Sequence, residues 1–295
     1  MNAQSLHIHI NGRTVPDTEP AVRALDRGLL YGDGLFETLR TYSRVPFRLR
    51  SHIERLNASA HELRFAHTLD ADDARAAIAE LLDLNGLADA YVRLTLTRGI
   101  HRGPLELTPA GPPTLCIIAK PIRPLPPERY DPGSSAIVAS VRQNADSPTP
   151  RHKTLNYLDK LLARTEARER GAHEAILLNT RGEVAEAASS SLFIVVRGRL
   201  ITPTLDANIL PGVTRHEILR LAAQAGLPAD QRTVDPRELA AADEAFLTNS
   251  VAEIVPLRSI NGATVGAGTP GPITRQIQAE YRRCIENAQD PAHAT

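Results

Sequence analysis

In the middle of the chain, a lysine lies between a proline-bearing segment and a run of leucines. Pro148 and Pro150 keep the backbone ahead of Lys153 extended, and leucines at 155, 158, 161 and 162 recur behind it at helical spacing. This pattern predicts that Lys153 stands at the start of an amphipathic helix with a buried leucine face, which ends near Gly171. The helix dipole and partial burial disfavour the ammonium form, so the side chain could act as a nucleophilic amine. A solvated lysine is the alternative.

Other segments supply groups that suit chemistry at such an amine. Glu186 lies between Val184 and a run of small residues, an unusual place for a carboxylate that only solvates a surface. Val213 and Thr214 follow a Pro-Gly turn and lead into a predicted helix, where backbone amides can bind an anion. Ser250 offers a hydroxyl and amides on a polar turn after a strand. A surface carboxylate at Glu186 and an ordinary helix cap at Thr214 are the alternatives.

The composition limits the kind of protein. With 295 residues the chain is long enough for two modest domains, each with its own core. Basic and acidic residues number 34 each, so no global charge favours nucleic acid or an anionic membrane as a partner. The two cysteines show no metal or redox spacing, and no segment resembles a signal peptide or a membrane span. We therefore expect a soluble, cytoplasmic protein.

The N-terminal part of the chain is expected to combine strands with helices. Ser51 and Glu54 form a capping-box pattern that predicts a helix from there to Phe65. Arg55 falls in the first turn of that helix, where the dipole disfavours a cation, so a local role and chance placement are both open. A second helix is expected over 71–85. The expected strands, with a hairpin turn at Asn11-Gly12, cover residues 6–10, 13–15, 35–42, 91–99 and 114–119.

A proline-rich segment separates this part from the rest. Residues 121–127 are too rich in proline for a helix or a central strand, and they predict an interdomain linker. The chain is therefore expected to form a small domain over 1–120 and a large domain over 128–295. The expected elements of the large domain are strands at 136–141, 174–178, 192–196, 200–201 and 245–250 and helices at 215–225, 236–241 and 276–287.

The strand at 91–99 could present a binding surface. Its alternation places Tyr91, Arg93, Thr95 and Thr97 on one face. A guanidinium beside a tyrosine suits a substrate carboxylate, because its planar fork matches the two oxygens. An ordinary solvated sheet face explains the same pattern equally well.

Three motifs, taken in order, resemble the class IV aminotransferases, which bind pyridoxal 5′-phosphate on fold type IV. They are Lys153 followed by Leu155-Asn156, Glu186 ahead of small residues and Leu192-Phe193, and the turn Leu210-Pro211-Gly212-Val213-Thr214. The resemblance extends from Asn11 to Thr274. It implies a two-domain α+β fold, with a small α/β N-terminal domain and a larger, mixed, β-barrel-like C-terminal domain. It also implies amino acid and 2-oxo acid substrates and a homodimer or larger homo-oligomer.

The resemblance implies roles for particular residues. Lys153 would attach the cofactor aldehyde and then carry the substrate proton as acid and base. Glu186 would keep the ring nitrogen protonated. Tyr157 matches a tyrosine near the cofactor's phenolic oxygen, and Ser191 stands where the family usually has asparagine. The implied phosphate contacts are Arg55, Val213, Thr214 and Ser250, and the implied substrate-pocket residues are Tyr31, Phe36, Tyr91, Arg93, Arg98 and Val251.

The motifs leave the reaction open. Tyr91-Val92-Arg93 resembles the branched-chain aminotransferases, whereas Thr97-Arg98-Gly99 resembles the D-amino-acid aminotransferases and the aminodeoxychorismate lyases. We expect an amino group to move between an aliphatic, branched-chain or D-amino acid and a 2-oxo acid such as 2-oxoglutarate. The alternative is a lyase that releases pyruvate and 4-aminobenzoate from aminodeoxychorismate.

Overall fold

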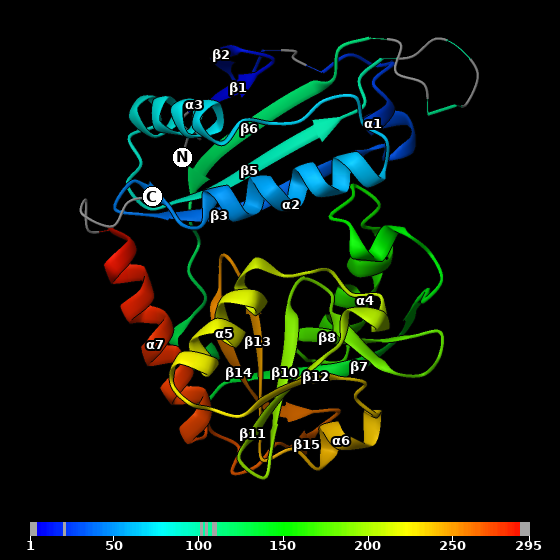
Figure 1. The fold of residues 1–295 in the computed structure, drawn as a ribbon, viewed down its shortest axis with the longest axis vertical. Helices are drawn as coiled ribbons and strands as arrows, with labels where there is room; N and C mark the ends of the chain where they lie inside the picture. The colour runs from blue at the N-terminus through cyan, green and yellow to red at the C-terminus, as the bar shows by residue number, and fades with distance from the viewer. Residues whose placement is uncertain (1–4, 20–21, 101–102, 104–105, 108–110, 290–295) are drawn as a thin grey trace. The chain divides into compact units, whose positions relative to one another are not determined.

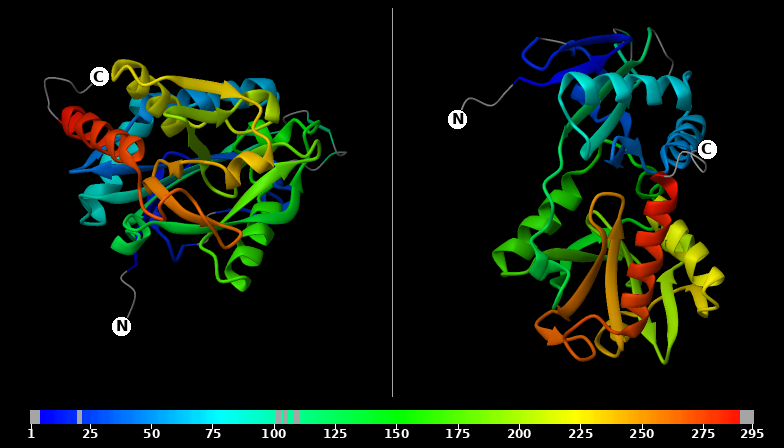
Figure 2. Two further views of the ribbon diagram at one scale, coloured as in Figure 1. Left: turned by 90° about the horizontal axis from the view of Figure 1, so that it is seen from below. Right: turned by 90° about the vertical axis from the view of Figure 1, so that its left-hand side faces the viewer.

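The computed structural model describes residues 5–19, 22–100, 103, 106–107 and 111–289 (Figures 1 and 2). The chain divides into two compact units. Unit 1 comprises residues 1–123, 153–156 and 288–295, and unit 2 comprises residues 124–152 and 157–287. The first boundary, between Arg123 and Pro124, falls inside the segment predicted as a linker. The four residues from Lys153 to Asn156 belong to unit 1, although the chain on either side of them belongs to unit 2.

The described part of unit 1 is built on a six-stranded antiparallel sheet. In sheet order the strands are β2 (Arg13–Pro16), β1 (His7–Ile10), β6 (Thr114–Pro121), β5 (Ala90–Thr97), β3 (Gly34–Tyr42) and β4 (Val45–Pro46). Helices α2 (Leu49–Glu62) and α3 (Ala71–Leu84) pack on one face of this sheet, and the short α1 (Arg27–Tyr31) precedes β3 (Figure 1). Alternate residues of β5, such as Val92 and Leu94, enter the core beneath the helices, so the other side chains of the strand lie on the opposite face.

The helix starts in unit 1 depend on different signals. Asp70 caps α3 by accepting hydrogen bonds from the amides of Asp72 and Asp73, and the helix ends close to the predicted position. In contrast, α2 begins at Leu49, after Arg48 turns the chain with a φ of 56°. The predicted capping box at Ser51 is therefore wrong, because the helix has already begun there. Arg55 consequently lies in the second turn, where the helix dipole has little effect on its charge.

The described part of unit 2 is built on a nine-stranded mixed sheet. Strand β7 is parallel to β8 and to β14, β11 is parallel to β12, and the remaining pairs are antiparallel. The sheet order is β12 (Ala229–Arg232), β11 (Arg199–Pro203), β10 (Ser191–Val196), β13 (Glu244–Asn249), β14 (Glu253–Ile260), β7 (Ser134–Gln143), β8 (Glu174–Asn179) and β9 (Val184–Ala187), with β15 (Ala263–Thr264) beside β14.

The helices of unit 2 are α4 (Leu158–Glu169), α5 (Val213–Gln224), α6 (Pro236–Ala240) and α7 (Pro272–Gln289). Asp235 and Glu238 form a reciprocal capping box at the start of α6, which confirms the predicted cap. Helix α5 takes in Val213 and Thr214 as its first residues, so both lie at a helix start as expected. No helix in the described ranges is long and apolar enough to cross a bilayer.

Helix α4 differs most from expectation. It begins at Leu158, and its buried residues are Ala163 and Ala167, which pack against β7 and β8. Leu158, Leu161 and Leu162 are 67 %, 54 % and 52 % exposed. The predicted buried leucine face is therefore wrong. Alanines allow a helix to approach a sheet closely, and the leucines are left on the outer side of the unit.

Candidate functional site

Lys153 lies on the edge of the unit 1 sheet. The Phe36 amide donates a hydrogen bond of 2.8 Å to the Lys153 carbonyl, and the Leu155 amide donates one of 2.9 Å to the Gly34 carbonyl. Thr154 forms an isolated antiparallel bridge with Leu35. The half-buried lysine is thus positioned by strand pairing with β3, and the predicted helix N-terminus begins only at Leu158. Its Nζ lies 4.6 Å from the centroid of the Phe36 ring.

A buried ion cluster beneath β3 holds Arg55. Arg55 donates from Nε to Glu37 Oε1 at 2.8 Å and from Nη2 to Oε2 at 2.5 Å, and His52 Nδ1 lies 2.7 Å from Oε2. Burial opposes the charge on Glu37, but Arg55 and His52 outweigh it and lower the pKa of this carboxyl to about 2. Burial, Arg55 and Lys153 together lower the pKa of His52, which the Glu37 carboxylate only partly offsets. The cluster fixes the orientation of the Arg55 guanidinium.

Cations and aromatic rings meet on the sheet face opposite α2 and α3. The pattern of burial along β5 confirms that Tyr91 and Arg93 lie on this face. The guanidinium carbon of Arg93 is 3.8 Å from the centroid of the Phe36 ring, so one ring contacts both Arg93 and Lys153. Lys120 Nζ lies 4.7 Å from the centroid of Tyr91. This face therefore presents an apolar ring beside positive charge.

Two predicted substrate residues have other surroundings. Tyr31, the last residue of α1, is 55 % exposed, with the Arg27 guanidinium 5.5 Å from its ring. Arg98 is buried and donates to the Asp33 carboxylate, to the Arg64 carbonyl at 2.7 Å and to the Leu63 carbonyl at 2.9 Å. Both ends of its guanidinium thus hold the chain after α2. This geometry argues against the substrate contact predicted for Arg98.

In unit 2, Glu186 is a buried carboxylate on β9. Its Oε1 lies 2.6 Å from the ammonium of Lys160 on α4, and its Oε2 accepts from the Leu210 amide at 3.3 Å. The ammonium of Lys160 also lies 5.5 Å from the centroid of Tyr157, whose hydroxyl donates to the Ala188 carbonyl at 3.4 Å. Lys160 was not predicted to have a role. The structure links it directly to two of the predicted cofactor residues.

The start of α5 has the geometry of an anion site. Gly212 precedes Val213 and Thr214, and no side chain of the described chain caps this helix start. The Thr214 hydroxyl lies 3.3 Å from the Ser250 hydroxyl. A Cβ built on Gly212 would lie 2.7 Å from Ser191 Oγ, so the backbone passes close to that hydroxyl. The structure therefore brings Ser191, Thr214 and Ser250 together at the positive end of a helix dipole, which suits a phosphate.

Val251 continues the turn that carries Ser250. Its amide donates a hydrogen bond of 2.9 Å to Asn249 Oδ1, which also accepts from the Ala252 amide at 2.8 Å. Asn249 Nδ2 in turn donates to Ser190 Oγ at 3.0 Å. Asn249 thus fixes the turn on which Ser250 and Val251 lie, a function that the sequence alone did not indicate.

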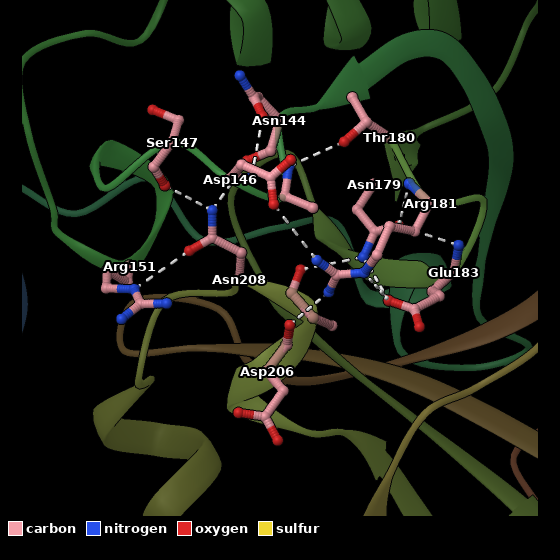
Figure 3. Close-up of polar contacts among 12 residues, drawn as sticks. Asn144, Asp146, Ser147, Arg151, Asn179, Thr180, Arg181, Glu183, Asp206 and Asn208 are labelled. Atoms are coloured by element: carbon pink, nitrogen blue, oxygen red, sulfur yellow. Dashed lines mark hydrogen bonds and ion pairs between the residues drawn. The ribbon is translucent and has the colours of Figure 1, made fainter.

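A second asparagine orders the segment that leads to Lys153 (Figure 3). Asn208 is fully buried with a left-handed φ of 63°. Its Nδ2 donates to the carbonyls of Asn144 and Ser147 at 2.8 Å and 2.7 Å, and its Oδ1 accepts from Arg151 Nε at 3.2 Å (Figure 3). Asn208 therefore ties residues 144–151 to the chain that enters the Pro-Gly turn. Nothing in the local sequence pattern marked it.

The comparisons with known proteins agree with this arrangement. The amino-transferase class IV family model matches residues 34–260. The branched-chain-amino-acid aminotransferase of Escherichia coli K12 is 35 % identical over 283 residues, which cover 93 % of this chain and 91 % of that protein. The aminodeoxychorismate lyase of Bacillus subtilis strain 168 is 35 % identical over 284 residues, or 95 % of each chain.

A solved structure shows the same fold with a cofactor derivative. It is a branched-chain amino acid aminotransferase from T.th. complexed with N-(5′-phosphopyridoxyl)-L-glutamate, and it superposes with a TM-score of 0.88. The two sequences are 29 % identical, and the match covers 98 % of this chain and 97 % of that one. The chain therefore belongs to the amino-transferase class IV family and is a two-domain, fold-type IV aminotransferase that depends on pyridoxal 5′-phosphate.

Proposed function

We propose that this aminotransferase moves the amino group of an aliphatic, branched-chain amino acid to a 2-oxo acid such as 2-oxoglutarate. The observation that carries the proposal is the Phe36 ring, which contacts both Lys153 and Arg93. An apolar ring beside the amine suits an aliphatic side chain, and a nearby guanidinium suits the second carboxylate of glutamate. The full-length similarity to a branched-chain aminotransferase supports the same substrate class.

The residues present fit the cofactor. Pyridoxal phosphate supplies an aldehyde for amino groups and a ring that accepts electrons from the substrate Cα. In unit 2, Glu186 is a buried carboxylate able to accept the ring N–H, and the start of α5 with Ser250 suits the phosphate. Tyr157 and Ser191 remain proposed polar contacts to the cofactor. In unit 1, Arg55 is proposed to add charge to the phosphate, and Lys153 to provide the amine.

We propose that Lys153 also carries the proton of the reaction. Its backbone is held on both sides by hydrogen bonds to β3, so its amine is confined to a small region above Phe36. A primary amine in that place can take a proton from the substrate Cα and return it at a neighbouring atom. The Phe36 ring excludes water from one side of the amine, which limits proton exchange with solvent. Tyr31, Tyr91 and Val251 are proposed as further walls of the substrate pocket.

A second candidate reaction is elimination of pyruvate from aminodeoxychorismate. The full-length match to an aminodeoxychorismate lyase favours it specifically. The two reactions differ in where the substrate's amino group ends. Transfer leaves it on the cofactor until a 2-oxo acid removes it, whereas the lyase releases an aromatic amine.

An amino-donor screen followed by cofactor absorbance tests the proposal. Leucine, isoleucine or valine alone should convert the bound cofactor to its amine form, and 2-oxoglutarate should restore the original spectrum. Arg93→Leu should raise KM for glutamate by about tenfold or more and leave leucine nearly unchanged, because one charge-assisted contact is lost. The assignment as an aminotransferase for aliphatic donors fails if D- and L-amino acids leave the spectrum unchanged and aminodeoxychorismate yields pyruvate.

Borohydride reduction tests the assignment of the amine. The chain contains three lysines, Lys120, Lys153 and Lys160, so a lysine-specific digest can distinguish all possible side-chain adducts. We expect the reduced cofactor on Lys153. An adduct on another lysine would contradict the proposed site.

We propose also that the enzyme is a homodimer or a larger homo-oligomer. The exposed leucines of α4 support this, because clustered apolar side chains on a surface favour association. A cytoplasmic location is proposed as well, supported by the two free cysteines, Cys116 and Cys284.

A further inference from the structure

Lysine is rare in this chain. Only three of its 34 basic residues are lysines, and the rest are arginines. Each lysine contacts a residue of the proposed site: Lys120 lies over Tyr91, Lys153 lies over Phe36, and Lys160 is paired with Glu186. Guanidinium serves equally well for general surface charge, so a lysine in such a chain indicates a position where the compact ammonium acts differently.

The pair formed by Lys160 and Glu186 is well shielded. The two side chains are 17 % and 4 % exposed, and 2.6 Å separates Lys160 Nζ from Glu186 Oε1. The second oxygen, Oε2, has a longer contact of 3.3 Å with the Leu210 amide. A carboxylate has about four acceptor positions, so this single-point contact leaves room for another donor. An arginine fork would instead occupy both oxygens.

We propose that Lys160 is a positioning residue that shares the Glu186 carboxylate with the ring nitrogen of the cofactor. The proposal rests on the proposed role of Glu186. Lys160 acts as its permanent counter-ion, which keeps the carboxylate charged and in place. Because the ammonium already neutralises part of that charge, it also moderates how strongly Glu186 holds the ring N–H.

The chemistry of Lys160 fits a permanent cation. Burial by itself opposes the charge, but the carboxylate of Glu186 outweighs burial and raises the pKa of Lys160 above its ordinary value. The Tyr157 ring, 5.5 Å from the ammonium, adds a favourable cation–π contact. Lys160 therefore stays protonated and is a poor nucleophile, in contrast to the role proposed for Lys153.

Two substitutions of Lys160 should act in opposite directions on cofactor binding. In Lys160→Met, Glu186 loses its counter-ion, so the protein without cofactor should melt at a lower temperature. The ring N–H then becomes the sole cation on Glu186, and the Kd for pyridoxal phosphate should fall by about tenfold. In Lys160→Arg, the guanidinium engages both oxygens, and the Kd should rise by about tenfold. Lys120→Met serves as the matched control and should leave Kd within about twofold.

A cofactor analogue with a C–H group in place of the ring nitrogen isolates the mechanism. We would measure Kd by titrating cofactor-free protein with pyridoxal phosphate and with this analogue, and verify folding by circular dichroism. The differences among wild type, Lys160→Met and Lys160→Arg should disappear with the analogue. Parallel losses of affinity in both variants, for both ligands, would show a packing role only and overturn the proposal.

The outcome also separates this inference from the proposed function. Wild-type protein that binds no pyridoxal phosphate, or that carries the reduced adduct away from Lys153, would refute the proposed site itself. Wild-type protein that binds at Lys153, with Kd unchanged in both Lys160 variants, would refute only the role of Lys160.

Discussion

Glu37 is a buried carboxylate that keeps its charge because two neighbours oppose the effect of burial. Its two oxygens contact Arg55 and His52 at 2.5 Å to 2.8 Å. Each member of the cluster depends on the others, since removing one partner leaves an uncompensated buried group. A residue proposed to contact a phosphate, Arg55, is therefore also part of the core of unit 1.

The first prediction concerns pH. The pKa of Glu37 is lowered from 4.5 to about 2, so its contribution is present above pH 4.5 and is lost as the pH falls toward 2. The shift corresponds to about 3 kcal/mol of unfolding free energy. The lowered pKa of His52 acts in the same direction, because the unfolded chain takes up a proton first as the pH falls below 6.5. Urea unfolding at several pH values should show stability falling with acid.

Glu37→Gln provides the comparison for this prediction. The variant should be less stable at neutral pH, because Arg55 loses its partner, but its stability should fall less steeply below pH 4.5. Identical slopes for the variant and the wild type would show that Glu37 is not the group that titrates.

The second prediction separates two proposed phosphate contacts. Arg55→Ala and Thr214→Ala should each weaken cofactor retention, by roughly 1.5–3 kcal/mol for the charged contact. Only Arg55→Ala should also lower the melting temperature of cofactor-free protein, because Glu37 is left unpaired. Titration of cofactor-free protein and thermal unfolding measure the two effects. Unchanged cofactor affinity in both variants would place the phosphate elsewhere.

At the scale of elements, the turn around Asn208 joins segments that are distant in sequence. A left-handed residue ends a short 3₁₀ turn over Leu205–Ala207, and its side chain holds residues 144–151 (Figure 3). A neighbouring arginine, Arg181, donates from Nη2 to the Asp206 carbonyl and also pairs with Glu183. The turn is therefore held from both sides ahead of the Pro-Gly sequence.

The third prediction tests this turn. Asn208→Gly keeps the left-handed backbone but loses three side-chain hydrogen bonds, which should lower the unfolding free energy by about 3 kcal/mol. Asn208→Ala should lose about 1 kcal/mol more, because a left-handed alanine is strained. Asn261→Gly is the control, since Asn261 has a similar φ of 51° and one such bond, to the Val138 amide. Equal losses at both positions in chemical denaturation would contradict this assignment.

Local signals in the sequence predicted elements well and long-range contacts poorly. The caps at Asp70 and Asp235 act within one turn of chain, so the starts of α3 and α6 could be predicted. The Pro-Gly turn likewise predicted that Val213 and Thr214 open a helix. The position of Lys153 could not be derived in this way. Its place is set by pairing with β3, whose residues are more than 100 positions earlier.

The candidate site shows the same division. The lysine, the carboxylate and the phosphate turn were identified from motifs, whereas Lys160 and Asn208 were missed because their partners lie in other elements. The leucine face of α4 misled for a related reason. Helical spacing identifies an apolar stripe, but it does not say whether the stripe or the alanines beside it face the sheet.

At the scale of the molecule, those leucines give the fourth prediction. Leu158→Glu with Leu161→Glu should shift the protein toward smaller species, because charge on an apolar contact surface opposes association. Multi-angle light scattering at several concentrations measures the mass. Leu205→Glu is the control, since Leu205 is also exposed but lies outside α4. A mass equal to the wild type's in the double variant would remove α4 from the interface.

The pairing of Lys153–Asn156 with β3 has a consequence for dissecting the protein. A fragment ending at Arg123 would contain the strands of unit 1, but residues Gly34 to Phe36 would have lost the segment that hydrogen-bonds their outer edge. An uncovered strand edge is a template for pairing with another chain. Such a fragment should therefore aggregate through β3, and a short peptide with the sequence of residues 151–157 should slow that aggregation by capping the strand.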